Sequence, residues 1–235
     1  MSGRSPRWFT GIKHLYEANF ADNTWAQVIA ACQRGTVPET WAVGNQKTMT
    51  INGKDYLIDI IGINHDTYTA GGKAPLTFQL HDCYADTKDM NSLDTNSGGW
   101  TSCAMRSTHL PAILALMPTE VQNGIREVNK LTSAGDTSST IITTADKLFL
   151  LSEIEIFGIA TKSYDGEGSQ YAYYSAGNYP AGNSKVKNFS GSANTWLERS
   201  PYMRDSEGFC SVNKNGLDSN SRATSSHGVA FAFCF

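Results

Sequence analysis

Gly228-Val-Ala-Phe-Ala-Phe-Cys-Phe235 is the most informative segment of this sequence, because its eight residues carry no charge. So apolar a β-strand would invite aggregation if it were exposed, and we therefore expect it to be buried. Upstream, Phe209-Cys-Ser-Val-Asn-Lys-Asn-Gly216 alternates apolar and polar residues and ends in an Asn-Gly turn. The residues from Trp196 onward are predicted to fold back as the central framework, with Trp196 in the core and Arg199 as an internal clamp.

The rest of the chain adds short helices and further strands. Thr24 followed by Gln27 has the pattern of a capping box and predicts a helix that stops at Gly35. Asn52-Gly53 between two β-rich runs predicts a hairpin. The remaining expected elements are a strand over 76–81, a loop over 82–99, helices over 102–116 and 119–128, core strands over 139–158, a helical turn over 170–175 and an irregular stretch over 178–194.

These elements predict one α+β domain over residues 24–235, in which short helices lie against antiparallel sheets. Residues 1–23 are assigned to an N-terminal arm. Its Arg4, Arg7, Trp8 and Phe9 form a possible docking segment.

Composition limits the possible functions. The 19 basic and 22 acidic residues give a net charge of -3, which provides no electrostatic basis for binding nucleic acid or a membrane surface. No apolar run is long enough for a membrane helix, and the N-terminus has no apolar core of a signal peptide. The five cysteines show no zinc-binding spacing. We expect buried thiols in a protein assembled in a reducing cytoplasm.

Six ordered motifs carry a family resemblance: Trp41-Ala-Val-Gly44, Gly62-Ile-Asn-His-Asp66, Thr95-Asn-Ser-Gly-Gly-Trp100, Leu150-Leu-Ser-Glu-Ile-Glu-Ile-Phe-Gly158, Trp196-Leu-Glu-Arg-Ser-Pro201 and Gly228-Val-Ala-Phe-Ala-Phe-Cys234. Together they resemble an uncharacterised domain family of gut Firmicutes and their phages. The family's tail usually reads Gly-Val-Ala-Pro-Ala-Phe, and Phe231 replaces the proline here.

The closing pattern also resembles C-type-lectin-like domains of the formylglycine-generating-enzyme type. Phage receptor-binding proteins and bacterial adhesins use that fold, so the resemblance implies a C-type-lectin-like domain with a ligand-facing surface. The Glu-Pro-Asn and Trp-Asn-Asp calcium motifs of sugar-binding C-type lectins do not occur in the sequence. Calcium-dependent sugar binding is therefore not expected, and neither is any other cofactor.

Two polar groups are candidate metal sites. His65-Asp66, with Asp59 on the preceding strand, could ligate a metal or act as an acid/base pair, but Asp after a strand is more often a turn residue that caps backbone amides. The second group could ligate calcium, although its spacing is not that of an EF-hand and a solvated loop is favoured. It consists of Asp86, Asp89, Asn91, Asp94 and Asn96.

Glu153 and Glu155 alternate with isoleucines, which predicts a strand that points both carboxylates to one face. Their spacing would permit glycoside cleavage. The structural alternative, which we favour, is that Glu153 pairs with Arg106 or Arg199 to lock the fold. Cys210 and Cys234 lie in apolar strands, where thiols usually act as inert filler.

The better functional candidate is a surface on two turns between buried strands. Rigid scaffolds that present Tyr, Asn and Arg on loops are typical of binding modules, although ordinary solvated turns have the same composition. The candidate binding residues are Tyr202, Arg204, Asp205, Asn213, Asn215, Asp218, Asn220 and Arg222.

We therefore expect a non-enzymatic protein of a phage virion, or alternatively of a bacterial cell surface. It would bind a host glycan or protein, contact other virion proteins and leave the cell by lysis. Two alternatives are a purely structural decoration or collar protein and a glycan-cleaving enzyme using Glu153 and Glu155. A homo-oligomer is expected to form through globular faces, because no coiled-coil heptads occur.

Overall fold

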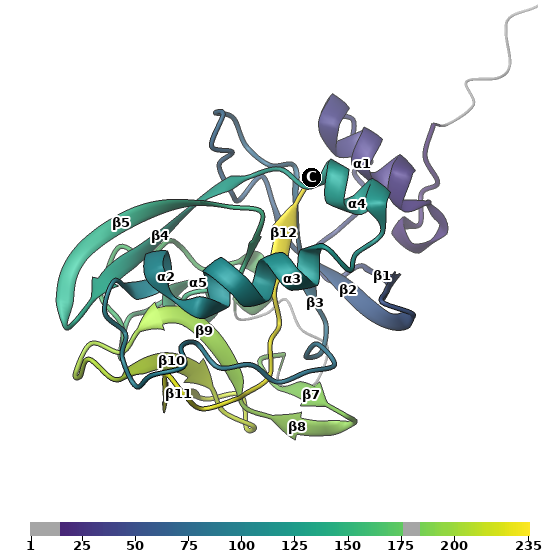
Figure 1. Ribbon diagram of the computed structural model, residues 1–235. Helices are drawn as coiled ribbons and strands as arrows, with labels where there is room; N and C mark the ends of the chain where they lie inside the picture. The colour runs from purple at the N-terminus through teal and green to yellow at the C-terminus, as the bar shows by residue number, and fades with distance from the viewer. Residues whose placement is uncertain (1–14, 176–183) are drawn as a thin grey trace, which may run out of the picture.

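The computed structural model describes residues 15–175 and 184–235 and has an α+β fold, as predicted. Its largest sheet has the strand order β1-β2-β3-β12-β6, and all neighbouring strands are antiparallel (Figure 1). The five strands are β1 (Gln46–Ile51), β2 (Lys54–Ile63), β3 (Leu76–Leu80), β12 (Ala232–Cys234) and β6 (Leu148–Phe149). The predicted hairpin at Asn52-Gly53 joins β1 to β2 and is confirmed.

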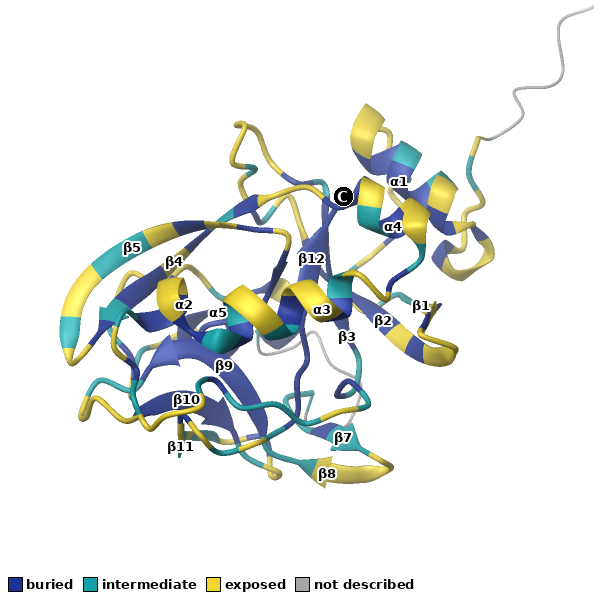
Figure 2. Cartoon of the chain, in the orientation of Figure 1, coloured by how far each residue is buried: buried dark blue, intermediate teal, exposed yellow. Residues whose placement is uncertain are grey.

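The apolar segment that ends at Phe235 is buried, as expected. β12 lies inside the sheet, between β3 and the edge strand β6, and Figure 2 shows it as buried along its length. Phe231, Phe233 and Phe235 have no exposed surface, and the rings of Phe233 and Phe235 pack against Phe78 of β3. Burial of these aromatic side chains is a major source of the fold's stability.

Three smaller antiparallel sheets complete the β-structure. The first has the order β11-β10-β9, and the other two are the hairpins β4-β5 and β7-β8. Their strands are β9 (Trp196–Pro201), β10 (Gly208–Val212), β11 (Asp218–Arg222), β4 (Val128–Gly135), β5 (Ser138–Asp146), β7 (Lys187–Phe189) and β8 (Ser192–Asn194). β7 and β8 occupy part of the stretch predicted to be irregular, and its residues 178–183 lie outside the described ranges.

The helices are short and lie around the sheets. They are α1 (Trp25–Arg34), α2 (Gly99–Ser102), α3 (Leu110–Leu114), α4 (Thr119–Gly124) and α5 (Glu153–Phe157), together with a π-helix (Met105–His109) and two 3-10 helices (Phe20–Asp22 and Ala172–Tyr174). The capping box of α1 is confirmed, because Thr24 Oγ1 accepts from the Gln27 amide and Gln27 Oε1 accepts from the Thr24 amide. None of the described helices is long and apolar enough to cross a bilayer.

One predicted element type and one predicted boundary are wrong. Residues 153–157 form α5 and not a strand, because Ser152 and Glu155 make a second capping box and Gly158 ends the helix in a left-handed conformation. Ser152 Oγ accepts from the Glu155 amide at 3.2 Å, and Glu155 Oε2 accepts from the Ser152 amide at 3.1 Å. The helix predicted over 119–128 ends at Gly124, since Val128 begins β4.

The segment predicted as an N-terminal arm is described only from residue 15 onward. Phe20 is buried and its ring packs against those of Trp25, Trp41 and Phe78. The predicted docking residues Arg4, Arg7, Trp8 and Phe9 lie outside the described residues.

Candidate functional site

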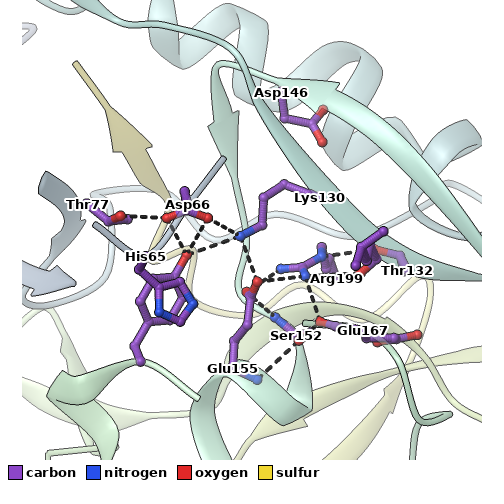
Figure 3. Close-up of polar contacts among 12 residues, drawn as sticks. His65, Asp66, Thr77, Lys130, Thr132, Asp146, Ser152, Glu155, Glu167 and Arg199 are labelled. Carbon is purple, nitrogen blue, oxygen red and sulfur yellow. Dashed lines mark hydrogen bonds and ion pairs between the residues drawn. The ribbon is translucent and has the colours of Figure 1, made fainter. Parts of the chain in front are cut away.

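A buried chain of alternating charges links strands β4 and β9 to α5 (Figure 3). Lys130 Nζ of β4 lies 2.8 Å from Asp66 Oδ1 and 2.6 Å from Glu155 Oε1 of α5. Glu155 in turn accepts from Arg199 of β9 at 2.5 Å and 3.0 Å, a two-pronged contact. We call Asp66, Lys130, Glu155 and Arg199 the charge chain.

Arg199 is the internal clamp that the sequence predicts. It has no exposed surface, and its guanidinium donates to Thr132 Oγ1 at 2.9 Å and to the Leu150 carbonyl at 2.8 Å, in addition to Glu155. These contacts join β4, β9 and α5. Trp196, on the same strand, is also fully buried, as expected.

The electrostatics of the charge chain fit a framework. Burial alone would raise the pKa of Asp66, but the charge of Lys130 and the hydrogen bonds from Lys130 and Thr77 together outweigh it and lower the pKa to about 2. Burial likewise opposes the charge of Glu155, yet Arg199 and Lys130 hold the pKa of that carboxyl below its usual value. Each ionised group is thus neutralised by its neighbours, and the chain stabilises one arrangement of strands and helix.

The predicted grouping of Asp59 with His65 and Asp66 is not found. Asp59 Oδ2 lies 2.9 Å from His81 Nδ1 and accepts from Tyr173 Oη at 2.7 Å. His65 instead stacks on Tyr171 with ring centroids 3.9 Å apart. Among the residues that the structure describes, no group of three or more His, Cys, Asp or Glu side chains is arranged to hold a metal.

The prediction that the Asp66 side chain caps backbone amides is also wrong. Its carboxylate accepts from side chains, namely Lys130 Nζ, Tyr171 Oη at 2.9 Å and Thr77 Oγ1 at 2.5 Å. Because these donors come from distant parts of the chain, the local turn pattern around residue 66 could not reveal them.

Glu153 does not pair with Arg106 or Arg199, contrary to prediction. Its carboxylate accepts from the backbone and side chain of Ser163 at 2.7 Å each and from Thr161 Oγ1 at 2.6 Å. Arg106 pairs with Asp146 at 2.6 Å. Since Glu153 and Glu155 lie in one helical turn and both are buried, the strand geometry on which glycoside cleavage depends is absent at these two residues.

The described cysteines are all free and buried. Burial raises the pKa of the Cys32 and Cys103 thiols to about 12 and that of Cys210 and Cys234 well above the usual value. A thiol that resists ionisation is a poor nucleophile, in agreement with the role as filler predicted for Cys210 and Cys234.

The predicted calcium-binding loop is divided among separate contacts. Asp89 bonds His109 Nε2 at 2.9 Å, and Asp86 lies 3.7 Å from Lys88 Nζ. Asn91 accepts from the Ala104 amide at 2.9 Å, and Asp94 lies 3.0 Å from Arg222 Nη1. The five candidate oxygen donors therefore do not converge, and the loop reading that the sequence favours agrees with the structure.

Asn96, the fifth candidate, has a different role. Its buried amide donates to the carbonyls of Asp205 at 2.9 Å and Gly208 at 2.8 Å, and its oxygen accepts from the Asp136 amide at 2.8 Å. A Cβ on Gly135, whose φ is +76°, would lie 1.9 Å from the Asn96 carbonyl oxygen, so only glycine permits this approach. Asn96 thus ties together three loops that are far apart in sequence.

Further contacts extend this loop assembly. Tyr164 Oη donates to the Thr137 carbonyl at 2.5 Å, and the Met203 amide donates to the Lys162 carbonyl at 2.8 Å. Arg222 joins Glu207 at 2.6 Å to Asp94. We call the surface formed by residues 91–98, 135–137, 162–164, 202–207 and 222–224 the loop end.

The structure divides the eight predicted binding residues between two places. Tyr202, Arg204, Asp205 and Arg222 belong to the loop end. Asn213, Asn215 and Asp218 lie at the opposite end of the β10-β11 hairpin, and Asn220 lies between, opposite Cys210. Since β10 rises about 3.3 Å per residue, its five residues separate the two turns by roughly 13 Å.

Several of the eight side chains stabilise the turns themselves. Asp205 Oδ1 accepts from the amides of Glu207 and Gly208, and Asn213 Oδ1 accepts from the amides of Asn215 and Leu217. These are the local bonds that Asp and Asn commonly make in turns. Asp218 accepts from Thr161 Oγ1 at 2.7 Å.

Leu93 is the functional candidate that the sequence reasoning missed. It belongs to the loop end and is 72% exposed, which makes it the most exposed large apolar residue among those described. Arg204 is also exposed. Leu93 is the one large apolar residue in the run Asn91-Ser-Leu-Asp-Thr-Asn-Ser97, and this isolation was a readable signal.

Comparison with known proteins gives one family and no named relative. Residues 76–235 match the model of a family described as Domain of unknown function (DUF6273). No curated protein and no solved structure matches the chain. Because the matched residues make up more than half of the sequence, the chain belongs to the DUF6273 family.

Proposed function

We propose that this protein is a non-enzymatic component of a phage virion whose loop end binds a glycan or protein on the host cell. The observation that carries the proposal is the side-chain amide of Asn96, whose hydrogen bonds hold together three loops that are far apart in the sequence. Loops that are fixed before binding lose little conformational entropy when a ligand binds. A rigid framework with ordered loops at one end is a common design for recognition.

The chemistry of the loop end fits a binding surface. An exposed Leu93 offers apolar contact, and Arg204 offers charged hydrogen bonds. The ion pairs of Arg222 with Asp94 and Glu207 border this surface. The charge chain, by contrast, is sealed from solvent and its groups are mutually neutralised, which suits a scaffold better than catalysis.

The phage setting and a C-type-lectin-like fold enter the proposal through the sequence resemblance. Small antiparallel sheets and short helices support that fold assignment (Figure 1). The proposed protein assembles in the bacterial cytoplasm and is released by lysis as part of a particle.

Binding of the purified protein to intact host bacteria tests the proposal. The double variant Leu93→Ser with Arg204→Ala is expected to weaken binding by about ten-fold or more, because apolar and Arg contacts usually dominate an interface. The matched control is Leu217→Ser with Lys214→Ala, which changes exposed residues at the opposite turn and should bind like wild type.

Unchanged melting temperatures in both variants would show that the fold is intact. Equal binding by the two variants would rule out the loop end as the recognition surface. Absence of binding by the wild-type protein would favour a purely structural virion component.

A further inference from the structure

Most sheet edges among the described strands are protected in one of three ways. β6, β7 and β8 have only two or three residues, and β11 carries the charges of Asp218 and Arg222. β1 carries Lys47. The outer edge of β9 is covered by backbone bonds such as that from the Arg199 amide to the Leu151 carbonyl. Short length, charge and cover are the usual protections against strand-to-strand association.

Most of the edge of β5 has none of these protections; the exception is one end, where Arg106 Nη2 donates to the Ala145 carbonyl at 3.2 Å. The strand has nine residues, from Ser138 to Asp146, and β4 is its only partner among the strands that the structure describes. The eight residues from 138 to 145 include no charge and no proline, and most are β-branched. In Figure 1 β5 is the outermost ribbon on its side of the molecule, and Figure 2 shows most of it as exposed or intermediate.

We propose that β5 pairs with β5 of a second copy of this chain. The two strands run antiparallel about a two-fold axis, and the two hairpins form one continuous four-stranded sheet. This inference concerns assembly and does not depend on the proposed host binding.

Symmetry and strand length select the register. In a two-fold antiparallel pair one residue must face its own copy, and Ile142 is the central residue of β5. An axis at Ile142 sets the two ends of β5 opposite each other and Thr140 opposite Thr144, which are favourable neighbours. An axis at Ile141 would instead set Ala145 and Asp146 opposite Thr137 and Asp136, which lie in the β4-β5 turn and outside the strand.

A disulfide tests this register directly. Every native cysteine is buried, so a cysteine at position 142 is the reactive one. Under mild oxidation Ile142→Cys is expected to give a covalent dimer of twice the 25.6 kDa chain mass. Thr140→Cys is the matched control, because two copies of residue 140 would lie four residues apart, roughly 13 Å and beyond the reach of a disulfide.

Light scattering measures the same association without a crosslink. The wild-type protein is expected to form a dimer, and Thr143→Lys should convert it to a monomer by placing a charge on the exposed edge. Thr108→Lys, at an exposed position on the π-helix, should remain dimeric. The proposal is overturned if the wild type is a monomer, if Thr143→Lys stays dimeric, or if the 140 and 142 cysteines crosslink equally.

Discussion

Glu198 and Arg199 are neighbours on β9, yet they enter two very different buried environments. Successive residues of a strand point to opposite faces, so the two side chains face different surroundings. Arg199 completes the charge chain, where positive and negative groups alternate. Neither oxygen of the Glu198 carboxyl has a hydrogen-bond partner among the described residues, and the nearby charges are mainly those of Glu153, Glu167 and Asp218.

The two environments illustrate the two ways in which a protein can bury an ionisable group. On the Arg199 side the groups stay ionised because opposite charges contact one another. On the Glu198 side burial and the neighbouring carboxylates raise the pKa of Glu198 well above its usual value, so the group keeps its proton. Burial also raises the pKa of Glu167, to about 7, against the hydrogen bonds from Ser200 and Ser133.

The largest effect is expected from breaking the charge chain. Lys130→Met would leave Asp66 and Glu155 without their shared cation, and a buried charge that loses its partner destabilises a protein by about 3–5 kcal/mol. Urea denaturation measures the free energy of unfolding. Lys147→Met, at an exposed lysine just after β5, is the control and should leave it unchanged. A loss below about 1 kcal/mol in Lys130→Met, the size typical of exposed pairs, would contradict this account of the chain.

A smaller change in the free energy of unfolding, which depends on pH, is expected from the buried carboxyl groups of Glu198 and Glu167. Both folded and unfolded states hold the proton below the usual glutamate pKa of 4.5, but above it only the folded state does. Stability should therefore fall as the pH rises, by roughly 2–3 kcal/mol between about pH 5 and pH 8 from Glu167 alone. Glu198→Gln keeps the neutral form, so it should match wild type near pH 5 and exceed it near pH 8.

Urea denaturation across this pH range checks both statements. The acid side provides an internal comparison, since Asp66 and Glu155 have lowered pKa values and their stabilisation is lost as the pH falls below the usual carboxylate range. Stability should thus be greatest near pH 5. If the free energy of unfolding of the wild type does not change from pH 5 to 8, or if Glu198→Gln is less stable than the wild type near pH 8, Glu198 is not protonated in the folded protein.

The smallest effect is expected for an ion pair without burial. Arg222 bonds Asp94 and Glu207 at the loop end, where solvent screens the charges. Arg222→Ala should leave the melting temperature within error of wild type, in contrast to Lys130→Met. A clear drop in its melting temperature would show that this pair stabilises the fold as the buried ones do.

Local sequence patterns predicted several elements correctly. The Thr24–Gln27 capping box, the Asn52-Gly53 hairpin and the buried β12 each depend on neighbouring residues alone. The same kind of signal was overlooked once, because Ser152 and Glu155 also form a capping box and mark α5 as a helix. The alternation of Glu and Ile there resembles a strand, but a capped single turn has the same composition.

Side-chain partners that are far apart in sequence were not predictable in this way. Glu155 was expected on a strand beside Glu153, whereas it bonds Lys130 and Arg199 from a helix. Asn96 resembled a possible calcium ligand, whereas it holds the carbonyls of the β9-β10 turn. Five of the eight candidate binding residues lie on turns, as predicted, whereas Asp218, Asn220 and Arg222 lie on β11. Their division between two ends of a hairpin depends on the strand register.

Composition, capping patterns and apolar runs fixed which segments become helix, turn or buried strand, because those preferences act over a few neighbouring residues. The tertiary structure alone decided which buried charges are paired, which carboxyl must keep a proton and which loops share one surface. Such outcomes depend on contacts between distant segments, and a buried charge is stable only when the completed fold brings it a partner.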